Sequence, residues 1–204
     1  NLHFKYAKAE NFLCFDEEGI EINFESYGNI VTIKGKNLDV MEQDGEKASN
    51  GSGKSSVPEI IVYGLYGKTI KKPKQLTHLD LINNKADKKL VVEVRWDNYR
   101  VVRKRDASNK QTLQFWEEDA DGEWVEISKG KGTQAEIEAK IGLTYESFIN
   151  IFIFSDDNTH PFLECDSTKK REIVENILSL EKYRSHSENA KELTKNLKAK
   201  IKDL

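Results

Sequence analysis

The sequence predicts an α/β fold in which an antiparallel β-meander and several helices lead into a coiled coil. Short apolar segments are separated by two-residue turn signals, Asp97-Asn98 and Asp121-Gly122, which are typical of β-hairpins. Near the end of the chain, apolar residues recur at spacings of three and four, as in a coiled-coil seam. Of the 204 residues, 37% are apolar and 33% are charged, so we expect part of the chain to be solvated helix.

Seven segments are typical of strands. Residues 3–8 and 20–25 alternate polar and apolar side chains. The β-branched run NIVTIKG, 29–35, suits a buried strand that leads into a tight turn. The other four segments form two predicted hairpins, 89–96 with 99–105 and 112–118 with 123–128. All three tryptophans fall in this meander, where we expect them to cover its apolar face: Trp96, Trp116 and Trp124.

The helical segments alternate with polar loops. Residues 36–49 are polar and acidic and predict a loop, whereas 54–66 predicts a helix with Pro58 near its first turn. Three further segments follow: a helix over 133–142 that ends at Gly142, a segment over 146–155 that begins as helix and ends as an apolar strand, and a helix capped by Ser167.

The last residues predict the root of a coiled coil. The seam consists of apolar residues separated by Lys and Glu: Ala190, Leu193, Leu197, Ile201 and Leu204. An ordinary amphipathic helix end is the alternative, because only about two heptads are present and a firm assignment takes three or four. We therefore expect one domain over 1–183 and the coil root over 184–204.

Cysteine content and hydropathy exclude several classes of protein. Cys14 and Cys165 form no CxxC pair, so a disulfide framework and a cysteine-rich zinc site are not expected within these residues, as suits a reducing cytoplasm. No run of eighteen apolar residues occurs and no signal peptide is visible. We therefore expect a cytoplasmic protein with no membrane partner.

The strongest chemical signal is the run Asn50-Gly51-Ser52-Gly53-Lys54-Ser55-Ser56, which lies between a predicted strand and a predicted helix. Glycines let backbone N–H groups close around phosphate oxygens, and the helix N-terminus adds unpaired donors and a positive dipole end. We expect Lys54 to bridge the β- and γ-phosphates of ATP as the catalytic residue. Ser55 would ligate Mg²⁺ and Ser56 would reach the α-phosphate.

The full phosphate-loop pattern GxxxxGK[ST] is not met locally, because Ala48 stands where the first glycine belongs. Gly35 closes the preceding predicted strand, so we expect the loop to begin at Gly35 and to resume at Asn50. Seventeen residues separate Gly35 from Gly53, where four would suffice. We expect the excess, 38–49, to bulge out at the surface.

Charge is spread unevenly, although the net charge is only −3. Residues 68–110 hold thirteen Lys or Arg against five Asp or Glu, whereas 10–26 and 117–126 are acidic. Such lysines often only solvate loops and strand edges. Alternatively, they form a basic face for a phosphate backbone, in which case Lys71, Lys72 and Lys74 contact DNA.

Most of the chain resembles the N-terminal half of the ATPase head of the SMC-like double-strand-break repair family. That family includes bacterial SbcC and the large subunit of phage recombination endonucleases. The resemblance begins at Asn11-Phe12. It continues through NGSGKSS, EIIVYGLYGK (59–68), LIN (81–83), the hairpin VVEVRW–YRVVR (91–103), GLTYESFINIFIF (142–154) and PFLECDSTKKREIVENILSLEKY (161–183). The LYGK ending and the last segment are more specific than the phosphate loop.

The resemblance implies an ABC-type nucleotide-binding head. In such a head the signature motif, the Walker B carboxylates and the switch histidine lie in a C-terminal half beyond a long coiled coil. ATP is sandwiched between two copies of the head. A metal-dependent nuclease subunit docks near 167–183 and the coil root, and ATP binding and hydrolysis control its processing of double-stranded DNA ends. The family places such a protein in the cytoplasm of a bacterium or of a phage-infected host, and a segment with only the first half would not hydrolyse ATP alone.

The sequence departs from the family pattern in two places. Family members often carry a Gln that helps to hold Mg²⁺ after the IFIF-like strand. Residues 155–160 contain no Gln here, so Asn158 or a carboxylate would substitute. The family's NF segment often continues with a basic residue and Ser near the nucleotide, and Leu13 and Cys14 stand there instead.

Three other functions fit parts of the sequence. A small P-loop kinase needs a compact parallel sheet and an arginine-bearing lid, whereas this chain has a predicted meander and six arginines. A different SMC-like chromosome or DNA-binding ATPase would share the phosphate loop and the coil. A scaffold that binds ATP only structurally would show no turnover even with its partner supplied.

Overall fold

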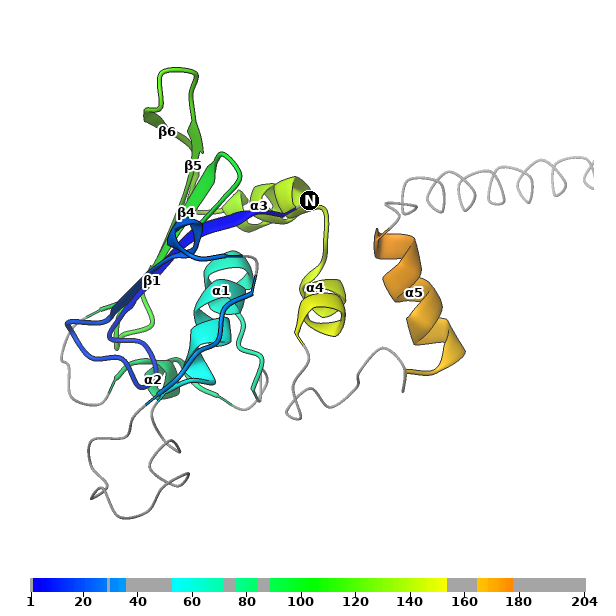
Figure 1. Cartoon of the computed structure of the whole chain (residues 1–204), viewed down its shortest axis with the longest axis horizontal. Coiled ribbons are helices and arrows are strands. Elements are labelled where there is room, and N and C mark those ends of the chain that lie inside the picture. Colours follow the sequence, from blue (N-terminus) through cyan, green and yellow to red (C-terminus); the bar gives the residue numbers. More distant parts are fainter. Residues whose placement is uncertain are drawn as a thin grey trace, which may run out of the picture. The chain divides into compact units, whose positions relative to one another are not determined.

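The computed structural model describes residues 2–28, 30–35, 53–71, 76–83, 89–153 and 165–177. The chain divides into two compact units, Asn1–Ile141 and Gly142–Leu204 (Figure 1). The predicted coil root, 184–204, the predicted boundary at 183 and the predicted loop over 36–49 lie outside the described residues.

The first unit is built on an antiparallel sheet. Within the described residues it has six strands in the order β2-β1-β3-β4-β5-β6. Their bounds are β1 Phe4–Glu10, β2 Ile20–Asn23, β3 Leu90–Trp96, β4 Tyr99–Arg105, β5 Gln111–Glu118 and β6 Trp124–Lys129. Both predicted hairpins are confirmed, with Asp97 (φ 45°) and Gly122 (φ 84°) in left-handed turn conformations. The strands predicted at 3–8 and 20–25 extend the meander beyond β3, and the second ends at Asn23, where a 3₁₀ helix over Phe24–Ser26 begins.

Helices cover one face of this sheet. The helix bounds are α1 Ser56–Tyr66, α2 His78–Leu81 and α3 Thr133–Ile141 in the first unit, and α4 Tyr145–Phe152 and α5 Ser167–Ile177 in the second. Helix α1 packs against β1, β3 and β4, and α3 packs against β5 and β6 (Figure 1). Gly64 permits the close approach of α1 to β3, because a Cβ at this position would lie 2.4 Å from Cγ2 of Val94.

The apolar core lies between α1, α3 and the covered face of the sheet. Val92, Val94 and Trp96 of β3 are fully buried there, and the Trp96 ring stacks on Phe115 with centroids 5.8 Å apart. Trp96 therefore covers the apolar face as predicted. The prediction is wrong for Trp116 and Trp124, because strand alternation turns both residues to the opposite face, where they pack against arginines.

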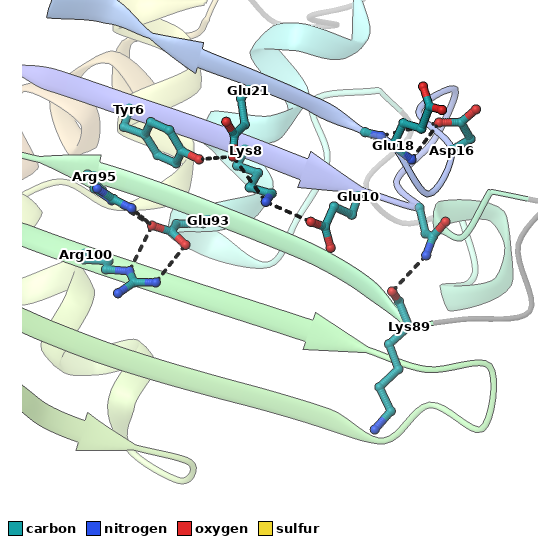
Figure 2. A network of polar contacts seen from close by, with 12 residues as sticks. Tyr6, Lys8, Glu10, Asp16, Glu18, Glu21, Lys89, Glu93, Arg95 and Arg100 are labelled. Carbon is teal, nitrogen blue, oxygen red and sulfur yellow. Dashed lines mark hydrogen bonds and ion pairs between the residues drawn. The ribbon is translucent and has the colours of Figure 1, made fainter.

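The open face of the sheet carries a network of charged and aromatic side chains (Figure 2). Glu93 is 8% exposed and accepts hydrogen bonds from Arg95 at 2.7 Å and from Arg100 at 3.0 Å. Arg95 lies over the Tyr6 ring, and Arg100 lies over the Trp116 ring. The cations of this face are thus matched by carboxylates and by aromatic rings within the same sheet.

The predicted buried strand at 29–35 is wrong. The described residues 30–35 form no strand, and Ile30, Val31 and Ile33 are 91%, 46% and 45% exposed. β-branched side chains favour extended backbone, but a strand also needs a neighbouring strand that supplies its hydrogen bonds. Among the described residues, neither edge of the sheet pairs with this run.

Two expectations for the second unit need correction. The apolar strand expected at the end of 146–155 does not start by Phe152, because α4 remains helical to that residue. Residues 154–155 lie outside the described part. Helix α5 is capped by Asp166 rather than Ser167, since Asp166 Oδ1 accepts the Lys169 N–H at 2.7 Å and Ser167 is already helical.

Candidate nucleotide-binding site

The described part of the predicted phosphate loop, Gly53 to Ser56, forms the entry to α1. Gly53 has φ 82°, a conformation that suits glycine, and its carbonyl accepts the Ser56 N–H at 2.9 Å. Ser55 is the N-cap residue, yet its side chain makes no capping hydrogen bond. The helix therefore leaves the Ser55 hydroxyl to other partners, while α1 confirms the helix predicted over 54–66.

A cysteine from a distant part of the sequence lies against this loop. A Cβ built on Gly53 would come 2.7 Å from Sγ of Cys14 and 3.8 Å from the Phe15 ring. Only glycine fits at position 53 with its present neighbours. The segment after Asn11-Phe12 thus lies beside the predicted phosphate loop.

The turn that contains Cys14 is strained and firmly anchored. Asn11 and Leu13 have positive φ values of 51° and 53°, which cost about 1–3 kcal/mol each in residues other than glycine. Leu13 donates its N–H to the Leu81 carbonyl at 2.8 Å, and Asn83 donates to the carbonyls of Asn11 and Leu13. The LIN segment, 81–83, therefore fixes this turn next to Gly53.

Helix α1 carries a buried carboxylate that sequence reasoning missed. Glu59, in the first turn, is 2% exposed and accepts the N–H groups of Ile70 at 2.6 Å and Lys71 at 2.9 Å. These bonds compensate for the cost of burying the carboxylate. A charged residue within the otherwise apolar run EIIVYGLY is the sequence signal that could have found it.

A buried arginine holds the other end of α1, and it too was missed. Arg103 is 6% exposed and donates to the carbonyls of Gly64 and Leu65 and to Oε1 of Gln134, at 3.2, 3.3 and 2.7 Å. Burial lowers the pKa of Arg103 to about 10. A cation at the C-terminus of a helix satisfies its last carbonyls and its dipole, so Arg103 joins α1, β4 and α3.

The remaining predicted site residues fall into two groups. Gly35 ends the exposed segment 30–35, and Lys71 is half-buried at the start of the predicted basic run. The others lie outside the described residues: Asn50, Gly51, Ser52, Lys72, Lys74 and Asn158. Within the described ranges, no three His, Cys, Asp or Glu side chains gather in a way that could hold a metal ion. No helix in those ranges is long and apolar enough to cross a membrane.

Comparison with known proteins agrees with the resemblance. The family model described as "AAA domain" matches residues 8–204. Exonuclease subunit 2 of Enterobacteria phage T4 is 29% identical over 168 residues, which cover 80% of this chain and 29% of the relative. The DNA double-strand break repair Rad50 ATPase of Pyrococcus abyssi is 27% identical over 185 residues, 89% of this chain and 20% of the relative.

The SbcC component of the SbcCD nuclease of Staphylococcus aureus is 27% identical over 213 residues, which cover 97% of this chain and 19% of the relative. The chain thus spans less than a third of the length of these relatives. The match to the family model covers nearly the whole chain, and the antiparallel sheet with its helices agrees with the predicted α/β class. The chain belongs to the AAA domain family and is an N-terminal ATPase region of the SbcC/Rad50 type.

Proposed function

We propose that this chain is the N-terminal part of an ATP-binding head in a DNA repair nuclease complex, with the lobe over 1–183 and the coil root over 184–204. The observation that carries the proposal is the entry to α1, where Gly53, Lys54 and Ser55 lead directly into the helix N-terminus. Backbone donors, a helix dipole and a lysine at one point suit the phosphates of a nucleotide. The names of the relatives, which are nuclease components and a DNA repair ATPase, favour this function over a metabolite kinase.

The described residues fit both ATP and Mg²⁺. Gly53 keeps the loop free of a side chain, and the Ser55 hydroxyl makes no bond to its own helix. Lys54 would bind the β- and γ-phosphates, Ser56 the α-phosphate, and Ser55 would hold Mg²⁺, which neutralises phosphate charge when it is bound. We assign Gly35, Asn50, Gly51 and Ser52 to the same loop, and Asn158 to the metal in place of the family's Gln.

The exposed run at 30–35 supports a composite head. Ile30, Val31 and Ile33 would be a poor surface for an isolated domain, since contiguous exposed apolar residues mark interaction sites. We propose that the C-terminal half of the same head covers this run. A second head would then close over the nucleotide, and a metal-dependent nuclease subunit would dock near α5.

Double-stranded DNA is the proposed substrate of the complex, with Lys71, Lys72 and Lys74 as backbone contacts. Reversing these three charges is expected to lower the affinity for DNA and its salt slope, because each neutralised phosphate releases counterions. An unchanged slope would assign DNA to another surface.

The nucleotide site is tested by calorimetric titration of the full-length protein with ATP and Mg²⁺. Lys54→Ala is expected to abolish binding while circular dichroism stays unchanged. Lys68→Ala, which removes an exposed lysine after the C-terminal end of α1, is the matched control. Wild-type affinity in Lys54→Ala would refute the proposed function.

A further inference from the structure

The chain leaves α1 and folds back along it. After the left-handed cap at Gly67, residues 69–71 return to the first turn, where Glu59 binds the N–H groups of Ile70 and Lys71. Thr69 Oγ1 donates to the Lys71 carbonyl at 2.9 Å, so both backbone polar groups of Lys71 are bonded. The backbone of Lys71 is therefore fixed by α1 and by its own loop.

This fixed point lies at the nucleotide end of α1. Glu59 is three residues past Ser56, which places its Cα about 4.5 Å along the helix axis from the helix start. Figure 1 shows the chain reaching α2 beside the end where α1 begins. Helix α2 is tied to the same end through the bond from Leu13 to Leu81, next to Cys14 and Gly53.

The chemistry of Glu59 indicates a positioning role. Burying a carboxylate is costly, and a packing role alone would be met by an apolar side chain of similar size. The two carboxylate oxygens instead accept hydrogen bonds from two successive backbone N–H groups. Charge-assisted bonds of this kind fix a loop more firmly than bonds between neutral groups.

We propose that Glu59 is a positioning residue that holds Lys71 beside the phosphate loop as a phosphate-binding lysine. The proposal rests on the proposed function and deepens it. A lysine ammonium on a flexible stem binds phosphoryl oxygens as a point charge, whether they belong to the nucleotide or to a DNA backbone. Fixing the backbone of Lys71 lowers the entropy that this contact would otherwise lose.

The test is a double-mutant cycle in the full-length protein. Glu59→Gln, Lys71→Ala and the double variant are titrated with ATP and with ADP, both with Mg²⁺, and separately with duplex DNA over a range of salt. Lys71→Ala is expected to weaken one of these equilibria about tenfold, as suits one charged hydrogen bond. Glu59→Gln is expected to weaken the same equilibrium, and the double variant no further than Lys71→Ala.

The two arms identify the source of the phosphate. A loss confined to ATP, with ADP and DNA unchanged, assigns Lys71 to the terminal phosphate. A loss confined to DNA, with a salt slope lower by about one, assigns it to the DNA backbone. Lys68→Ala and Glu136→Gln, a lysine outside the Glu59 contact and a carboxylate on the first turn of α3, serve as controls.

The proposal is overturned if Lys71→Ala leaves every equilibrium unchanged, or if the two single losses multiply in the double variant. Should Glu59→Gln fail to fold, Thr69→Val replaces it, because this variant releases the Lys71 carbonyl without touching α1. It is expected to weaken the same equilibrium and to add nothing to Lys71→Ala. Wild-type affinity for ATP in Lys54→Ala would refute the proposed function itself, whereas loss in Lys54→Ala alone refutes only this role of Glu59 and Lys71.

Discussion

The sulfur of Cys14 lies against the backbone of Gly53, so close that a Cβ on Gly53 would stand 2.7 Å from it. Thirty-nine positions separate the two residues in the sequence, and the strained turn at Asn11 and Leu13 brings them together. Any change in either residue is therefore felt by the other, and by the loop to which Gly53 belongs.

Gly53→Ala is expected to lower the affinity for ATP at least about tenfold, which corresponds to about 1.4 kcal/mol. Its positive φ strains an L-residue, and its Cβ displaces Cys14 or the loop. Gly122→Ala is the matched control, since its φ is 84° and a Cβ there meets open space. Calorimetry that finds equal affinities in the two variants would contradict the contact, whereas partial recovery in Cys14→Ala/Gly53→Ala would support it.

Alkylation of Cys14 is expected to block nucleotide binding. Cys14 is exposed and Cys165 is buried, so iodoacetamide should label Cys14 first. The added group would occupy the space beside Gly53. Mass spectrometry and ATP titration check this outcome, with Cys14→Ala as the resistant control, and full ATP affinity in the labelled protein would argue against it.

Arg103→Met is expected to lower the free energy of unfolding by about 3 kcal/mol, because buried carbonyls at the end of α1 lose their donor. Lys104→Ala, the next residue on β4 with its side chain on the opposite face, should change stability by less than about 0.5 kcal/mol. Denaturant unfolding followed by tryptophan fluorescence distinguishes the two. Similar losses in both variants would show that Arg103 has no special role.

Stability is expected to fall as the pH rises above about 10. Burial and the hydrogen bond to Glu21 raise the pKa of Tyr6 from 10.0 to about 12. Between these values the folded state keeps a proton that the unfolded chain has lost, so the contribution of Tyr6 is complete below about pH 10 and disappears as the pH passes about 12. Chemical denaturation from about pH 8 to about pH 11.5 should show a shallower decline in Tyr6→Phe, and an identical decline would exclude this contribution.

Local patterns predicted the elements whose partners are close in sequence. The meander follows from alternating side chains and from the turns at Asp97 and Gly122, and α1 follows from an apolar run that begins after Ser55. The structure agrees because each hairpin pairs with its immediate neighbour along the chain. The second unit was predicted less well, since a single residue decides whether Asp166 or Ser167 caps α5.

Long-range contacts could not be predicted in the same way. The run at 29–35 has the composition of a strand, but pairing depends on a neighbour that composition does not reveal. Glu59 and Arg103 bind backbone groups eleven and thirty-nine positions away, and no local pattern specifies those partners. The contact between Cys14 and Gly53 likewise depends on two unusual backbone angles.

The arginines of the meander are committed to the protein's own structure. Arg95 and Arg100 bind Glu93, Arg103 is buried at the end of α1, and Arg105 binds Asn109. Arginine is the side chain that most often reads guanine in the major groove, whereas lysine meets phosphate as a point charge. If this unit contacts DNA through its lysines, it would grip any duplex regardless of base sequence, which is the behaviour required of a machine that must act wherever a chromosome breaks.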